Sequence, residues 1–514
     1  MKNRLLIIAV VISLSSCKKD FLNLVPQTSL SSASFFKSPA QFQQALNATY
    51  TPLRVIVNAG FYMDEMRSDN TFFTIYQANR GFERHREAYS QFTDDANATA
   101  TPNSPGDRWS SNYSGISMIN TLLGQISTTT VLSQGAKDSI SGEALFLRAF
   151  YYNDLVTHFG GVPLQVTQVK SAEESFQPRN TVDEVYTQIK ADLAAAIPLL
   201  PAVTTFPQTG RASKGAAKML LADVYMTQPT KEYAKAETEL LDVTKMNYGL
   251  LPNYADVFDP NNKNSMESIF EVQYKADLVS GQQSSFTWMF IPKSTNSEVI
   301  AGYHDGAMDI FSGWNVPTDE MVSSYEPNDL RLPASVAVVE GTISGVEDFT
   351  ITGLKSPVGY TPATGITPIY MIKKYFHPPY SIAFNTPDDF PIYRYSGALL
   401  LLAECLVDEN KAAEALPYLN QVRRRAGLAD LSEATADNVS NERRHELAFE
   451  NHRWLDLIRT GKAIEVLTAK GMRLKAKYGW ILPTAFNVTA EKFVYPIPFR
   501  EIQINKKLVQ NPGY

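Results

Sequence analysis

The sequence has little cysteine, little histidine and no excess of basic residues. Two of its 514 residues are Cys and six are His, and Lys plus Arg number 47 against 53 Asp plus Glu. So few cysteines exclude a fold that depends on several disulfides. A formal net charge of −6, without a basic block, lacks the electrostatic footprint of a nucleic-acid-binding protein. With 44% hydrophobic residues, the chain can nonetheless bury a large core.

The sequence also lacks the short motifs of common enzymes. It has no phosphate-binding glycine loop, no dinucleotide fingerprint and no nucleophile elbow. His445 and His452 are seven residues apart in a segment dense in arginine, which favours an ion-pair network over a metal site. Adjacent carboxylates could act as glycoside-cleaving pairs, although in polar loops they are usually solvated or bind a cation; the pairs are Asp64–Glu65, Asp94–Asp95 and Asp388–Asp389. We therefore expect no catalytic residue, no metal and no cofactor.

The N-terminus has the pattern of an export signal that ends in a lipid anchor. Two basic residues precede an apolar run over 5–14, which is too short to span a membrane. Small residues before Cys17 are what a lipoprotein signal peptidase requires, so we expect residues 1–16 to be a signal peptide and Cys17 to be acylated, for example by palmitate. The alternative is an ordinary secretory signal with a chance cysteine near its cleavage site. Residues 17–31 then form a polar tether, and Cys405, within an apolar helical pattern, is predicted to be buried.

Helical periodicity dominates the rest of the chain. The predicted helices cover residues 38–54, 113–127, 137–158, 182–199, 211–227, 231–246, 393–409, 411–426 and 441–460. In two hairpins, each helix carries an alanine, and the two alanines are twelve positions apart. They are Ala222 and Ala234 in the first hairpin, and Ala403 and Ala415 in the second. Small residues at this spacing are typical of the close helix crossing in tetratricopeptide repeats. We therefore expect a mainly α fold, a tetratricopeptide-like superhelix of helical hairpins.

Two stretches interrupt the helical pattern. Residues 60–112 lack clear periodicity and predict long loops. Residues 249–392 are rich in Tyr, Gly, Pro and Asn, and predict an inserted subdomain of short strands, turns and minor helices. The expected organisation is a helical region over 32–248, the insert over 249–392 and a C-terminal helical region over 393–514. Two prolines after Phe493 predict that the tail runs extended.

Aromatic residues are abundant, with 25 Tyr, 27 Phe and 5 Trp. Trp109, Trp288 and Trp314 stand in loop-like stretches, where flat aromatic faces can bind the C–H faces of sugar rings and polar neighbours can fix the hydroxyls. A structural role for each of these tryptophans stays open as the alternative. The candidate ligand-binding residues, chosen by residue type and loop position, are Trp109, Trp288, Trp314, Tyr76, Arg80, Asn103 and Tyr303.

Three segments resemble hallmarks of the SusD/RagB outer-membrane lipoproteins of Bacteroidetes. They are Gly142-Glu-Ala-Leu-Phe-Leu-Arg-Ala-Phe-Tyr-Tyr-Asn-Asp-Leu through Phe159-Gly-Gly-Val-Pro-Leu164, Glu442-Arg-Arg-His-Glu-Leu-Ala-Phe-Glu-Asn-His-Arg-Trp454, and Tyr495-Pro-Ile-Pro with Gln510-Asn-Pro-Gly-Tyr514. The resemblance implies a cell-surface lipoprotein that caps a SusC-like, TonB-dependent barrel and hands it a glycan or peptide fragment. It also implies that the tetratricopeptide units hold the barrel. The charged residues of the second segment look structural, and the family has no fixed ligand motif.

Three functions remain after this comparison. The first is a non-enzymatic protein that captures oligosaccharide for import, with the membrane contacted through the lipid anchor. The second is the same architecture serving peptides, as in relatives that resemble RagB. The third is a hydrolase or a pure scaffold. We favour the first.

Overall fold

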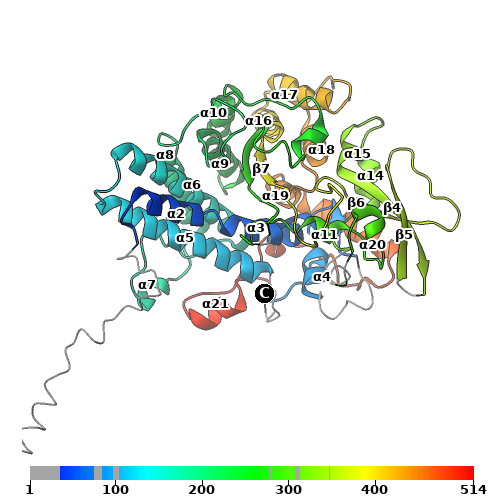
Figure 1. Ribbon diagram of the computed structural model, residues 1–514, viewed down its shortest axis with the longest axis horizontal. Helices are drawn as coiled ribbons and strands as arrows, with labels where there is room; N and C mark the ends of the chain where they lie inside the picture. Colours follow the sequence, from blue (N-terminus) through cyan, green and yellow to red (C-terminus); the bar gives the residue numbers. More distant parts are fainter. Residues whose placement is uncertain are drawn as a thin grey trace, which may run out of the picture.

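The computed structural model of the chain is mainly helical (Figure 1). It describes residues 35–74, 84–96, 104–277, 279–304, 306, 313–345 and 348–514. The expected signal peptide, Cys17 and the tether lie outside the described residues. No helix within these ranges is both long and apolar enough to cross a membrane.

The elements follow one another in three groups along the chain. The first group comprises α2 (Pro39–Ala48), α3 (Pro52–Gly60), the π-helix η2 (Phe61–Glu65), β1 (Thr71–Phe72), α4 (Arg84–Gln91), α5 (Ser104–Thr128), α6 (Gln134–Phe159), α7 (Ala172–Ser175), α8 (Val182–Ala196), α9 (Lys214–Thr227) and α10 (Tyr233–Thr244). The second comprises the 3-10 helix η4 (Tyr254–Val257), β2 (Ser268–Val272), α11 (Thr287–Phe290), α12 (Glu298–Ala301), β3 (Val316–Pro317), α14 (Asp319–Ser324), α15 (Arg331–Ser335), β4 (Val336–Ser344), β5 (Asp348–Lys355), β6 (Thr367–Ile372) and β7 (Phe390–Arg394). The third comprises α16 (Tyr395–Asp408), α17 (Ala412–Arg425), α18 (Ala436–Glu446), α19 (Arg453–Arg459), α20 (Ala463–Lys477), the 3-10 helix η5 (Ala490–Phe493) and α21 (Phe499–Ile504).

Helix pairs that follow one another in the chain form the scaffold. Helix α5 packs on α6, α6 on α8, α9 on α10, α10 on α16, and α16 on α17. Figure 1 shows α9 and α10 beside α16 and α17, so helices from both ends of the sequence continue one array. The prediction of a mainly α fold of helical hairpins is confirmed, and Cys405 is buried within α16 as expected.

Small residues allow the helices to approach one another closely. A Cβ atom at Gly115 of α5 would lie 2.3 Å from the Tyr151 ring of α6, so this crossing requires glycine. Ala222, Ala403 and Ala415 are fully buried, as the twelve-residue spacing predicts. The prediction is wrong for Ala234, which is exposed at the start of α10, and the buried position belongs instead to Ala236.

Three local predictions are also wrong. Among the described residues of 60–112 helix predominates over loop, because η2, α4 and the start of α5 lie there; Ser104-Pro105 opens α5, and proline is favoured in a first helical turn. The predicted helix over 441–460 is divided into α18 and α19 by a turn in which Phe449 and Asn451 have positive φ angles, so His445 and His452 do not share a helix face. The tail is not fully extended, because α21 begins directly after Pro498.

The strands form three small antiparallel sheets. Strand β4 lies between β5 and β6, β2 pairs with β7, and β1 pairs with β3. The outer edge of β5 is met by Asn296, whose amide donates to Ile351 O at 2.9 Å and accepts from Ile351 N at 2.9 Å. Strand β7 leads directly into α16, so the sheet with β2 orients the C-terminal helices.

A buried group of eight charged side chains joins the insert to the C-terminal helices. We call it the central ion cluster; its members are Glu267, Arg331, Lys374, Arg394, Arg425, Glu442, Glu446 and Glu450, all buried or nearly so. The guanidinium of Arg394 lies 2.7 Å from Glu267, 2.9 Å from Glu446 and 2.8 Å from Glu450. Arg331 reaches Glu442 at 2.6 Å. Four carboxylates therefore face four cations, and each charge removed from water has an opposite partner.

These pairings lower the pKa values of two carboxyl groups of the cluster, whereas burial raises the pKa of Glu442 above its ordinary value. Burial alone would raise the pKa of Glu446, but Arg425, Arg394 and Arg331 outweigh it and hold the pKa well below its ordinary value of 4.5. For Glu450, burial is opposed in the same way by Arg394 and Lys374, and the pKa is again lowered. Burial lowers the pKa of Lys374 to about 8, although Glu450 opposes this.

Replacing one cluster arginine should destabilise the protein strongly. Arg425 lies 2.9 Å from Glu267 and also contacts Glu446. We expect Arg425→Met to lower the free energy of unfolding at pH 7 by about 3–5 kcal/mol, because it leaves buried carboxylates under-compensated. Urea unfolding followed by circular dichroism measures this loss. The matched control is the neighbouring Arg424→Met, whose side chain pairs at the surface with Asp430 and should change stability by less than about 1 kcal/mol. Equal losses for the two variants would contradict this role of the cluster.

The same cluster predicts a pH dependence of stability. A carboxyl group whose pKa is lowered on folding adds stability above its unfolded pKa of about 4.3, and this contribution is lost as the pH falls through the folded value. The unfolding free energy should therefore decrease as the pH is lowered below about 4.3. In Arg425→Met the decrease should be shallower, since the pKa of Glu446 moves back toward its ordinary value. Urea titrations between neutral and acid pH compare the two slopes, and identical slopes would speak against this assignment.

Candidate functional site

The first candidate site is a cavity of about 450 Å³ that we call the Trp314 cavity. It is bounded by α3 and η2, by α4 and the start of α5, and by segments near α11 and β7. Its lining residues are Val55, Asn58, Ala59, Tyr62, Arg86, Ser104, Asp107, Ser285, Met289, Trp314 and Phe384. This mixture of aromatic, amide, hydroxyl and charged groups is typical of sites that bind polar organic ligands.

Two aromatic rings and one guanidinium form the centre of this cavity. The guanidinium of Arg86 lies 4.3 Å from the ring centre of Tyr62 and 4.5 Å from that of Trp314. Phe73 stacks on Trp314 at a centroid distance of 6.5 Å. Trp314 is 1% exposed, so its ring supports Arg86 rather than forming an open platform.

Contacts from several elements hold these groups in place. Tyr62 lies in η2, where its hydroxyl is 2.7 Å from Met289 Sδ. Trp314 N donates to Met289 O at 2.9 Å. The following residue, Asn315, has φ 57° and donates from its amide to Phe61 O at 3.0 Å. Asn315 thus ties the Trp314 segment to η2 and determines the width of the cavity between them.

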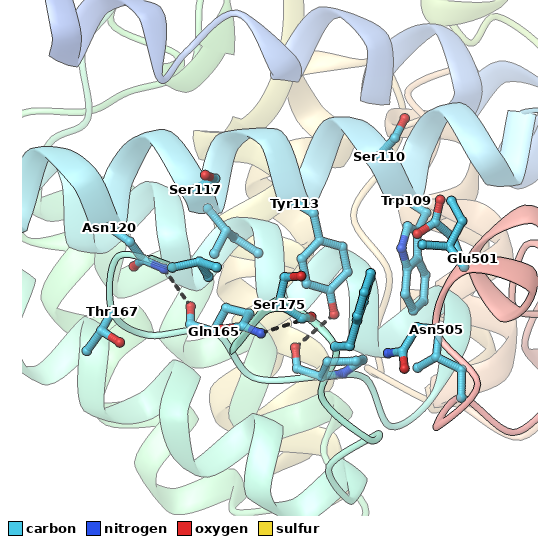
Figure 2. Close-up of a pocket in the computed structure, with 16 residues that line it drawn as sticks. Trp109, Ser110, Tyr113, Ser117, Asn120, Gln165, Thr167, Ser175, Glu501 and Asn505 are labelled. Carbon is cyan, nitrogen blue, oxygen red and sulfur yellow. Dashed lines mark hydrogen bonds between the residues drawn. The ribbon is translucent and has the colours of Figure 1, made fainter. Parts of the chain in front are cut away.

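A second cavity, of about 430 Å³, lies along one face of α5 (Figure 2). We call it the Trp109 cavity. Its walls are α5, the segment 163–176 and α21 with the residues that follow it. Figure 2 shows Trp109, Tyr113 and Asn120 projecting from α5 toward the segment that carries Gln165.

The structure separates the predicted ligand-binding tryptophans. Trp314 lines the first cavity and Trp109 the second. Trp288, 1% exposed, packs against the rings of Tyr380 and Phe384 and lines neither cavity, which fits the structural alternative.

The other predicted site residues are placed only in part. Tyr303 is half-buried, and its carbonyl oxygen accepts from Ser297 Oγ at 3.3 Å. Tyr76, Arg80 and Asn103 lie outside the described residues. By sequence they adjoin residues that line the Trp314 cavity, since Arg86 and Ser104 follow them closely.

Sequence reasoning missed Tyr62 and Arg86. Both fall within the predicted loop region 60–112, but no spacing or motif distinguishes them from other polar or aromatic residues there. Arg86 becomes recognisable only when the fold brings it between the two rings.

Four of the six adjacent carboxylates lie close to a basic side chain of the protein. Asp64 lies 2.8 Å from Arg108 and 2.7 Å from His158, and Asp94 lies 2.9 Å from Arg67. In the remaining pair, Asp388 lies 2.7 Å from His377 and Asp389 lies 2.7 Å from Lys263. Burial raises the pKa of Glu65 to about 7. Over the described part of the chain, no group of three or more His, Cys, Asp or Glu could hold a metal ion.

Taken together, a helical-hairpin scaffold that carries several ligand-sized cavities is an architecture typical of a binding protein. Two sequence models match the chain: one described as "SusD family" over residues 266–514, and one described as "Starch-binding associating with outer membrane" over residues 20–226. The chain belongs to the SusD family. This is a family of binding proteins and not a class of enzymes.

Individual relatives agree with this membership. SusD-like protein P25 of Formosa agariphila is 25% identical, with 100% of this chain and 99% of that protein covered. Starch-binding protein SusD of Bacteroides thetaiotaomicron is 23% identical over 72% of each chain. Among solved structures, a laminarin binding SusD-like protein superposes with a TM-score of 0.74 at 26% identity, covering 93% of this chain and 100% of that one.

Proposed function

We propose that this protein captures oligosaccharide at the outer membrane and delivers it to a SusC-like, TonB-dependent transporter, without catalysing a reaction. The observation that carries the proposal is the Trp314 cavity, in which Arg86 is held between two rings beside amide and hydroxyl groups. The relatives that are named for laminarin and starch support a saccharide as the ligand class.

The chemistry of the Trp314 cavity suits a neutral, polyhydroxylated ligand. A guanidinium provides several N–H donors in fixed directions, and its stacking on Tyr62 and Trp314 removes much of its freedom before binding. Asn58 and Ser104 add a side-chain amide and a hydroxyl to the same wall. The volume of about 450 Å³ lies within the range of small-ligand sites.

Membrane attachment through Cys17 and docking on a barrel complete the proposal. The match of residues 20–226 to a family described as associating with the outer membrane supports this location. An acylated Cys17 would be joined to the folded chain by the residues up to Phe35, the first that the structure describes. The tetratricopeptide-like hairpins are the surface that we assign to the barrel.

Removing the guanidinium should weaken saccharide binding. We expect Arg86→Met, which keeps most of the unbranched apolar stem of the side chain but removes its donors, to bind about tenfold more weakly, a loss of about 1.4 kcal/mol. The measurement is affinity-gel retardation of the soluble chain on a panel of polysaccharides, followed by calorimetry with the matching oligosaccharide. A peptide digest is tested in parallel.

The control for this experiment is Arg424→Met, which removes a surface arginine of α17 far from the cavity in sequence and should bind as the unmodified protein does. Unchanged binding by Arg86→Met would place the site elsewhere. Binding of peptides in place of every polysaccharide would move the assignment to peptide uptake.

Attachment to the membrane should depend on one cysteine. We expect Cys17→Ala to move the protein from the detergent phase to the aqueous phase in Triton X-114 partitioning, because each acyl methylene contributes about 0.8 kcal/mol to membrane binding. Cys405→Ala is the control, since this thiol is buried in α16 and donates to Tyr233 O at 3.1 Å. Retention of the Cys17→Ala variant in the detergent phase would contradict the anchor.

A further inference from the structure

The Trp109 cavity is a second ligand-sized space that the proposed function does not use. Its volume of about 430 Å³ nearly equals that of the Trp314 cavity. Three segments far apart in sequence form its walls, namely α5, residues 163–176 and the region of α21.

Hydrogen bonds within the chain hold these walls together. From α5, Tyr113 donates to Pro163 O at 2.8 Å and Asn120 donates to Gln165 O at 2.7 Å (Figure 2). On the opposite wall, Asn505 donates to Gln177 O at 2.8 Å. A cavity whose walls are joined in this way is preformed, and binding there requires little reorganisation.

The lining is amphipathic and nearly without charge. Tyr113, whose ring centre lies 5.1 Å from that of the buried Trp109, supplies aromatic surface, and Thr167 and Asn505 supply polar groups. Among the described residues that line the cavity, only Glu501 carries a charge. Burial raises the pKa of this half-buried carboxyl, although Arg500 opposes the effect.

The outer face of α5 is also unusually free of charge. Asp107 and Arg108 are the only ionisable residues of this 25-residue helix that carry charge at neutral pH, and Arg108 is buried against Asp154 and Asp64. Beyond Asp107, the exposed positions near the cavity are Ser110, Ser114 and Ser117. An exposed helix usually carries Lys or Glu, which form helices better than serine does. The serine side chains here make the face polar but uncharged, and this suits it to a neutral, hydroxyl-rich partner.

We propose that the Trp109 cavity is a second saccharide-binding subsite, which takes one or two neutral pyranose units. A pyranose has an apolar C–H face for the aromatic and aliphatic wall and hydroxyls for Thr167 and Asn505, whereas an anionic ligand would meet Glu501 and no cation among the described lining residues. The choice of a saccharide over other neutral ligands rests on the proposed function.

The scarcity of cysteine allows a direct test. In the mature chain carrying Cys17→Ala, the remaining thiol of Cys405 is buried and its pKa is raised to about 12, so it does not compete for a maleimide. Val169 lines the cavity and is 37% exposed, while Val166, in the same segment and 39% exposed, does not line it. Val169→Cys and Val166→Cys are therefore a matched reporter and control.

The experiment compares maleimide labelling rates of the two variants with and without maltohexaose, laminarihexaose and cellohexaose, each added separately. We expect at least one saccharide to slow labelling of Val169→Cys several-fold and to leave Val166→Cys unchanged. No slowing by any saccharide, equal slowing of both variants, or slowing only by a peptide digest would overturn the proposal.

The test also separates this inference from the proposed function. Combining Val169→Cys with Arg86→Met should abolish most affinity-gel retardation through the Trp314 cavity but keep the protection at position 169. Loss of protection together with retardation would show that the Trp109 cavity is not an independent subsite. If a saccharide protects the thiol of Val169→Cys from maleimide but the unmodified protein is not retarded by any polysaccharide gel, only the assignment of the Trp314 cavity would be refuted.

Discussion

Pairing of buried charge is the constraint on which the rest of this molecule depends. Arg394 and Glu446 lie at the centre of a cluster of four cations and four carboxylates, contributed by the segment from Glu267 to Arg394, by α17 and α18, and by the turn that follows α18. Each of these charges would be costly to bury alone, so the cluster is stable only when all the contributing segments are in place. It therefore couples the folding of the insert to that of the C-terminal hairpins. The carboxylate of Glu450 can join it only because the chain turns sharply at Phe449 and Asn451.

Much of the fold could be predicted from the sequence because apolar periodicity is strong where helices pack on two sides. Helices α6, α9 and α16 are examples, with continuous buried faces. The start of α5 could not be predicted in this way, because Ser104-Pro-Gly-Asp107 is typical of a turn and its helical state depends on the distant pairing of Arg108 with Asp154. The break between α18 and α19 could not be predicted either, since positive φ at a phenylalanine is a local cost, and the contacts that hold this turn come from residues distant in sequence.

The candidate site was predictable only in outline. Residue type and position drew attention to Trp314, which lines the Trp314 cavity, but not to the role of its ring, which supports Arg86 instead of facing solvent. Tyr62, in η2, and Arg86, in α4, are 24 positions apart in the sequence, and both lie close to Trp314 in the fold. Their spacing in the sequence does not indicate this contact. Trp109 illustrates the opposite case, since it lines a cavity of its own on α5.

The contact of Asn296 with β5 affects whether neighbouring copies of this protein can pair through that strand. By bonding both backbone groups of Ile351, its amide occupies part of the edge of β5 where another strand would otherwise pair. The exposed charges of Asp348 and Lys355 stand at the two ends of the same strand. If the protein is confined by lipid to a two-dimensional surface, its copies meet far more often than they would in bulk solution, and an open edge would then nucleate lateral aggregation. One side-chain amide thus helps to keep neighbouring copies separate under crowding.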